Sequence, residues 1–188
     1  MLVVEGWIGR EGVRAAGQEF EQRGYKYLVT AGGPASDRWD EDRSSYAQKA
    51  ADELVRSGIP SDRIIVASAR DTERQRTFES AVAVWRALQA RSIHPKALNV
   101  FTLGSHARRS RLVVAKVYGS GTDIGVIDWL PSHDAALPWW RSSERAREVL
   151  AETAAYVFEV TLNSGRLSNS PTEDGSSGSV PHQKELVR

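Results

Sequence analysis

Five short apolar segments alternate with longer amphipathic segments between residues 2 and 129, and this alternation constrains the fold more than any other feature. The apolar segments lack the strict polar and apolar alternation of a half-exposed strand, which indicates strands that are covered on both faces. Parallel strands need a crossover connection, which is usually a helix. We therefore predict an α/β fold, a Rossmann-like three-layer α/β/α sandwich with a five-stranded parallel sheet in the order 3-2-1-4-5.

The elements can be placed from apolar runs and from the glycines and prolines between them. The predicted strands are Leu2–Glu5, Tyr25–Thr30, Arg63–Ala67, Ala97–Leu103 and Asp123–Trp129. The predicted helices are Glu11–Arg23, Ser44–Ser57, a helix with Phe78, Val82, Trp85 and Leu88 on its apolar face, His106–Tyr118 and Ser143–Leu162. From Gly165 on, the chain is rich in Ser, Gly and Pro and holds no aromatic residue. We expect one domain over residues 1–164 and a disordered tail over 165–188.

Composition excludes several classes of protein. The chain has 188 residues and a formal net charge of +1, so it is not a general polyanion binder, and we expect no nucleic-acid partner. It has no cysteine, which removes thiolate chemistry. No run is apolar enough to cross a bilayer, and no signal peptide is visible. The chain reads as cytoplasmic as it stands, and as envelope-associated if an upstream anchor precedes its first strand.

The segment Leu98–Leu112 indicates an anion site. An apolar strand runs through Gly104 and His106 into a helix that begins with Arg108, Arg109 and Arg111. Cations are disfavoured at a helix N-terminus, but they become useful there when an anion docks on the free N–H groups. The three arginines cannot share one helical face, so we expect Arg108 and Arg111 to be solvated and Arg109 to act.

The predicted strand order brings three glycine-containing loops to one crevice. Ligands of doubly wound sheets bind beyond the carboxyl ends of the strands, where the strand order reverses. Here that point lies between the first and fourth strands, beside the loops Glu5–Arg10 and Gly104–Arg109 and close to Gly32 and Gly33. Trp7 and Trp39 lie in loops near this crevice and are candidates to line a ligand pocket.

Each of these residues also has a purely structural interpretation. Gly6 supplies a tight turn or lets a ligand approach the backbone. His106 is a proton-transfer group or a helix-start residue bonded to a carbonyl, and Glu5 is a base or the partner of an arginine. In the loop before the third helix, Arg70 lies among acidic neighbours, which favours a solvated, salt-bridged loop. Trp139 and Trp140 are expected to pack the last helix onto the sheet, and the alternative is an exposed docking surface.

Familiar nucleotide and hydrolase motifs are absent. The sequence has no GxGxxG fingerprint, no phosphate-binding GxxxxGK[ST] loop and no GxSxG elbow. Ala31 and Gly32 stand where a ribose-binding acid would follow the second strand. The four histidines have no metal-ligand spacing, so we predict no metal site, and no cofactor is evident.

Five motifs follow one another over about residues 2–130. They are Val3-Val4-Glu5-Gly6-Trp7, Thr30-Ala31-Gly32-Gly33, Gly58-Ile59-Pro60, Thr77-Phe78-Glu79-Ser80-Ala81 and Thr102-Leu103-Gly104-Ser105-His106-Ala107-Arg108-Arg109-Ser110. In these motifs and their order the chain resembles the SanA/ElyC/YdcF family of bacterial envelope-associated proteins, whose function is largely unknown. Ser80 replaces the family's Asn, and Tyr46 replaces an acidic residue. The resemblance implies a role in envelope integrity or lipid-carrier metabolism, and one member has been considered a binder of S-adenosylmethionine.

These observations lead to a functional hypothesis with two alternatives. The first is that the chain binds an anionic, phosphorylated small molecule and acts on it, although the sequence does not make catalysis compulsory. The residues expected to act are His106, Glu5 and Glu79 in proton transfer, and Gly6, Trp7, Gly32, Gly33, Thr77, Ser105 and Arg109 in ligand binding. The alternatives are a module that binds S-adenosylmethionine or a nucleotide without catalysis, and a protein-interaction domain that docks through the Trp139/Trp140 loop.

Overall fold

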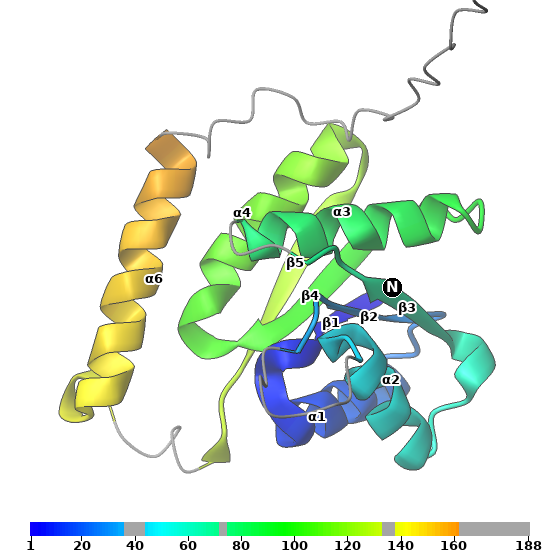
Figure 1. Cartoon of the computed structure of the whole chain (residues 1–188), viewed down its shortest axis with the longest axis horizontal. Coiled ribbons are helices and arrows are strands. Elements are labelled where there is room, and N and C mark those ends of the chain that lie inside the picture. The colour runs from blue at the N-terminus through cyan, green and yellow to red at the C-terminus, as the bar shows by residue number, and fades with distance from the viewer. Residues whose placement is uncertain (36–43, 72–74, 133–137, 162–188) are drawn as a thin grey trace, which may run out of the picture.

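The computed structural model describes residues 1–35, 44–71, 75–132 and 138–161 (Figure 1). One parallel sheet has the order β3-β2-β1-β4-β5. Its strands are β1 (Leu2–Glu5), β2 (Leu28–Gly32), β3 (Ile64–Ser68), β4 (Ala97–Leu103) and β5 (Asp123–Trp129). The predicted fold class and strand order are therefore confirmed. The expected tail over 165–188 and Trp39 lie outside the described residues.

Helices cover both faces of the sheet (Figure 1). On one face lie α1 (Gly9–Gln22) and α2 (Tyr46–Arg56), and on the other lie α3 (Arg76–Gln89) and α4 (Ala107–Tyr118). The last helix, α6 (Ser143–Thr161), stands beside α4 at the edge of the molecule. No helix in the described part of the chain is long and apolar enough to cross a membrane.

Two apolar cores form because successive side chains of a strand point to opposite faces. Val3 points toward α3 and α4 and packs with Val100 and Val113. Leu2 points toward α1 and α2, where it packs with Phe20, and the same face holds Val4. Glu5 follows Val4, so its side chain continues the face of Val3. This alternation directs the last side chain of β1 toward α4.

The second strand begins later than the sequence pattern predicts. It starts at Leu28, not at Tyr25, because Leu28 pairs with Leu2 of β1 and Ile64 of β3, the first residues of both neighbouring strands. Residues before Leu28 therefore have no strand beside them. Tyr25 takes a different role, because its hydroxyl accepts a hydrogen bond from the Asn99 amide at 2.7 Å.

The paired tryptophans do not join the last helix to the sheet, so that prediction is wrong. Trp139 and Trp140 contact each other edge to face, with ring centroids 5.7 Å apart. Trp140 is 65% exposed, and neither ring belongs to an apolar core. The reason is the position of α6, which packs against α4 and the turn before it instead of covering the sheet.

A glycine at the end of β1 allows α2 to dock closely. A Cβ atom at Gly6 would lie 2.7 Å from the carbonyl carbon of Tyr46, and closer still to the carbonyl oxygen. Gly32 lies against the same residue, and a Cβ there would meet the Tyr46 Cβ at 2.8 Å. Close packing of the first turn of α2 therefore accounts for both glycines.

We expect Gly6→Ala to lower the free energy of unfolding by about 1–3 kcal/mol, because the added methyl group must displace backbone. Urea denaturation followed by circular dichroism measures the change. Gly121→Ala is the matched control, since a Cβ at Gly121 meets no heavy atom within 4 Å. Equal stability of the two variants would show that α2 docks without this close contact.

Candidate functional site

The candidate site lies at the carboxyl ends of β1 and β4, where the strand order reverses. β1 ends at Glu5, and β4 runs through a 3-10 turn (Gly104–His106) into α4, which carries Arg109. Open α/β sheets bind their ligands at such a point, because the loops on either side diverge there. The topology thus brings Glu5, His106 and Arg109 together from opposite ends of the sequence.

Glu5 is a buried carboxylate held by two hydroxyl groups. It is 5% exposed, and its Oε2 accepts a hydrogen bond from Thr102 Oγ1. Its Oε1 accepts a second one from Ser110 Oγ at 2.8 Å. Thr102 and Ser110 are both fully buried. Burial of a carboxylate costs free energy unless its oxygens accept hydrogen bonds. The two hydroxyl groups supply these hydrogen bonds and hold the carboxylate of Glu5 in place.

His106 lies between two carboxylates. Its Nδ1 is 3.0 Å from Glu152 Oε1, and its Nε2 is 3.6 Å from Glu5 Oε2. The second distance is too long for a hydrogen bond, and Nε2 is buried without any hydrogen-bond partner. The edge-to-face ring of Trp7 lies against the imidazole, with centroids 5.0 Å apart. A proton on either nitrogen of the imidazole therefore faces a carboxylate.

Arg109 binds Glu152 through two parallel hydrogen bonds. Its Nε donates to Oε2 at 2.7 Å and its Nη2 donates to Oε1 at 2.9 Å. Nη2 also lies 3.0 Å from His106 Nδ1, and Nη1 donates to Thr77 Oγ1 at 3.1 Å. Two-point pairing of this kind is a strong interaction with a fixed geometry. The charge of Arg109 is thus already balanced by a carboxylate of the protein.

The ion pair changes the proton affinity of both partners. Burial by itself raises the pKa of the Glu152 carboxyl, but the hydrogen bonds and charges of His106 and Arg109 outweigh it and lower that pKa to about 2. Burial lowers the pKa of Arg109, and the hydrogen bond and charge of Glu152 raise it above its usual value. Both groups are therefore charged across the range in which proteins are stable.

Sequence reasoning missed Glu152, which reaches the site from α6. This helix has no buried residue, and polar contacts hold it to α4. Besides the ion pair of Arg109 with Glu152, a second ion pair joins the two helices, between Lys116 Nζ and Glu159 at 3.0 Å. The signal was present in the sequence, because Arg109 and Lys116 are seven residues apart on one helix, as Glu152 and Glu159 are on the other. Seven residues are two helical turns, which places each pair on one face.

Of the other residues predicted to bind a ligand, some lie at the site of His106 and some lie elsewhere. Trp7 and Thr77 contact the site through His106 and Arg109. Ser105 directly precedes His106 in the turn and is half-buried. The backbone of Gly33 accepts a hydrogen bond from Tyr46, so it lies beside α2.

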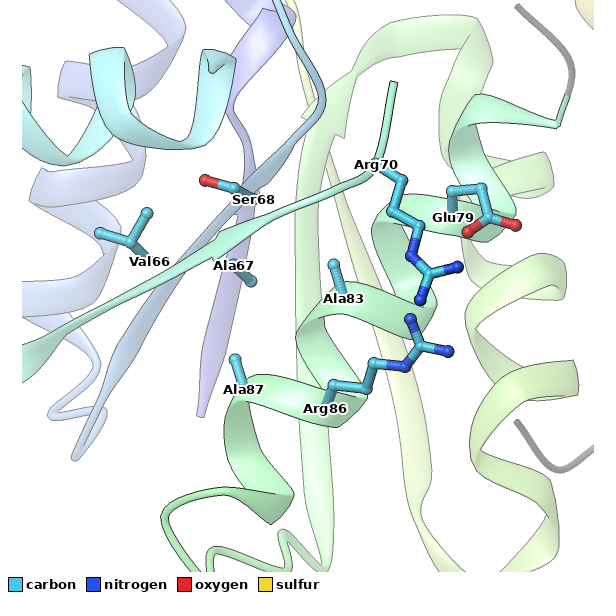
Figure 2. A pocket seen from close by; sticks show the side chains of 8 residues that line it. All are labelled: Val66, Ala67, Ser68, Arg70, Glu79, Ala83, Arg86 and Ala87. Atoms are coloured by element: carbon cyan, nitrogen blue, oxygen red, sulfur yellow. The ribbon is translucent and has the colours of Figure 1, made fainter. Parts of the chain in front are cut away.

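Glu79 faces a different part of the molecule. It follows Thr77 by two residues on α3, which directs the two side chains to different sides of the helix. Glu79 points into a cavity between α3 and β3 (Figure 2). The geometry therefore does not support a role for Glu79 in proton transfer beside His106.

No protein-family model matches the chain, and no curated protein matches it either. In the described part of the chain, no group of three or more histidine, aspartate or glutamate side chains is arranged to hold a metal ion.

We expect Glu152→Gln to destabilise the protein at neutral pH, and the difference from wild type to shrink as the pH falls from 4.5 to 2. The folded-state pKa of Glu152, about 2, lies below the ordinary value of 4.5. The ionised carboxylate therefore stabilises the folded state above pH 4.5, and this contribution disappears as the pH falls through the folded-state value. Urea titrations at several pH values measure it.

Glu148→Gln is the control for this experiment, because Glu148 is an exposed residue of the same helix. Its stability should follow that of the wild type at every pH. A Glu152→Gln curve parallel to that of the wild type would show that the ion pair contributes nothing to folding.

Proposed function

We propose that this protein binds a small anionic molecule, a phosphorylated one foremost, at the carboxyl ends of β1 and β4, and that His106 exchanges a proton with it. One observation carries the proposal. The fork of Arg109 holds an oxyanion in the structure, the carboxylate of Glu152, with His106 Nδ1 and Thr77 beside it. A guanidinium fork fits a carboxylate and a phosphate in the same two-point geometry.

In this proposal Glu152 occupies the place that the ligand takes. The helix that carries it has no buried residue, so its withdrawal exposes less apolar surface than that of a helix whose side chains belong to an apolar core. Withdrawal of Glu152 leaves Arg109 unpaired and Thr77 Oγ1 close to it, which makes an anionic replacement favourable. The incoming anion then restores the balance of charge that the site has in the structure.

The proton chemistry is assigned to His106 Nδ1, the ring nitrogen that lies 3.0 Å from Glu152 Oε1 and that an anion in the place of Glu152 contacts. Nε2 is buried on the other side of the ring, where Glu5 Oε2 lies 3.6 Å away. A ring nitrogen within hydrogen-bond distance of the ligand has the position of a general acid or base. Glu5, held by Thr102 and Ser110, faces the proton when Nε2 carries one.

The proposed class of ligand agrees with the resemblance to the SanA/ElyC/YdcF family, for which lipid-carrier metabolism implies a phosphorylated substrate. The alternative of S-adenosylmethionine or nucleotide binding gains no support from the site. The end of β2 carries Ala31 and Gly32, with no carboxylate for a ribose, and Gly32 is packed against α2.

Calorimetric titration with inorganic phosphate, a sugar phosphate and a short polyprenyl phosphate tests the proposal. We expect Arg109→Ala to weaken binding by about tenfold or more, because a charge-assisted hydrogen bond is lost. Glu152→Gln should bind the same anions more tightly than the wild type, since it removes the competing carboxylate. His106→Ala should lose any turnover of the ligand.

Arg108→Ala is the matched control, because Arg108 is the exposed neighbour of Arg109 on α4. It should bind as the wild type does. If Arg109→Ala binds every anion as well as Arg108→Ala, the fork is not an anion site and the proposal is wrong.

A second proposal, docking through the Trp139/Trp140 loop, is favoured by the exposure of apolar side chains in this loop and on α6, the helix that follows it. Trp140 is 65% exposed, and on α6 Leu150 is 64%, Val157 51% and Phe158 49% exposed. Leu150, Val157 and Phe158 have the spacing of one helical stripe. The simplest partner is a second copy, because a stripe of this kind packs against itself about a twofold axis.

We expect the wild type to form a dimer at high concentration, and Trp140→Ser and Val157→Ser to shift it toward monomer. Sedimentation equilibrium measures the association. Val55→Ser is the control, because Val55 is 48% exposed on α2, outside this stripe. A wild type that stays monomeric at every concentration would overturn this second proposal.

A further inference from the structure

A second hollow lies at the free edge of the sheet, apart from the site of His106. It is a cavity of about 360 Å³ between α3 and β3 (Figure 2). Among the described strands β3 pairs with β2 alone, so it is an edge strand of this sheet. Arg70, Glu79 and Arg86 provide the charged side chains, and Ser68 ends the strand beside them. The volume is in the range of pockets that bind small molecules.

The spacing of residues on α3 creates this hollow. Glu79, Ala83, Arg86 and Ala87 recur at intervals of four, three and one, which places them on one face of the helix. The two alanines leave space between the helix and the strand, because they carry only a methyl group. Longer side chains on either side of them form the walls, and Ala67 from β3 completes an apolar floor.

Two guanidinium groups converge at the mouth of the cavity. Figure 2 shows Arg70, from the loop after β3, and Arg86, from α3, with their guanidinium groups directed toward each other. In the part of the chain that the structure describes, neither group has a hydrogen bond or an ion pair. Arg70 is exposed, as expected of a solvated loop, but it forms no salt bridge among the described residues, and residues 72–74 of the loop lie outside them.

The charge of the cavity favours an anion. Arg70 and Arg86 contribute two positive charges, and Glu79 contributes one negative charge on the same wall. Like charges held close together cost free energy, and an oxyanion between them removes that cost. Two converging guanidinium groups also offer the paired donors that a phosphate accepts.

We propose that this cavity is a separate binding site for a small phosphate monoester, with the phosphate between Arg70 and Arg86 and a compact apolar body on Ala67, Ala83 and Ala87. The site does not depend on the function proposed for His106. Thr77, which contacts Arg109, and Glu79, which lines the cavity, point to different sides of α3. Glu79 faces the phosphate and opposes its binding, which limits the affinity of the site.

Phenyl phosphate is the probe, and the arginine Nε–H signals of the full chain, followed by NMR, are the readout. We expect the signals of Arg70 and Arg86 to move with saturation. Arg70→Ala and Arg86→Ala should each weaken binding by about tenfold. Glu79→Gln should strengthen it by about twofold or more, because an opposing charge is removed. Phenol should leave both arginine signals in place.

Two variants separate this site from that of His106. Arg109→Ala and Arg108→Ala should leave the response of Arg70 and Arg86 within about a factor of two of the wild type. If phenyl phosphate leaves the two signals unmoved, or if Arg70→Ala and Arg86→Ala bind like Arg108→Ala, the proposal is overturned. Loss of the response in Arg109→Ala would likewise overturn it, because only one site would then exist.

Discussion

The pairing of β1 with both β2 and β4 is the constraint on which the rest of the structure depends. β1 has only four residues, all of them buried, and it joins the two halves of the sheet. The strands that follow β1 in the sequence, β2 and β3, lie on one side of it, and β4 and β5 lie on the other. The loops after β1 and β4 therefore diverge, and the candidate site lies between them. Because side chains alternate along a strand, the register that buries Val3 among α3 and α4 also directs Glu5 toward Ser110.

The site at this point is a balanced set of charges, not a free cationic patch. Arg109 is paired with Glu152, and His106 is placed between Glu152 and Glu5. In a buried setting each of these charges is acceptable because the others are present. In the proposed function a ligand replaces one of these charges, and we infer that it replaces Glu152, since the helix that carries Glu152 has no buried residue.

The attachment of α6 differs in kind from that of the other helices. Each of α1, α2, α3 and α4 contributes side chains to an apolar core, whereas α6 is held to α4 by the ion pairs of Arg109 and Lys116, two helical turns apart. Ion pairs in partly exposed positions hold a helix more weakly than apolar burial does. The same arrangement leaves Leu150 and Val157 in solvent, so the outer face of α6 stays open to a partner.

The sequence alone determined the fold class, the strand order and the limits of β1, β4 and β5, because apolar runs of that length leave few other topologies. It also determined that Glu5, His106 and Arg109 meet, since the carboxyl ends of neighbouring parallel strands share one edge. Only the tertiary structure decided the rest. Glu152 enters from a helix whose position depends on packing, Glu79 turns away toward Arg70 and Arg86, and the tryptophans stay exposed. Contacts between elements that are distant in sequence depend on how helices lie across one another, and no local pattern of residues specifies that.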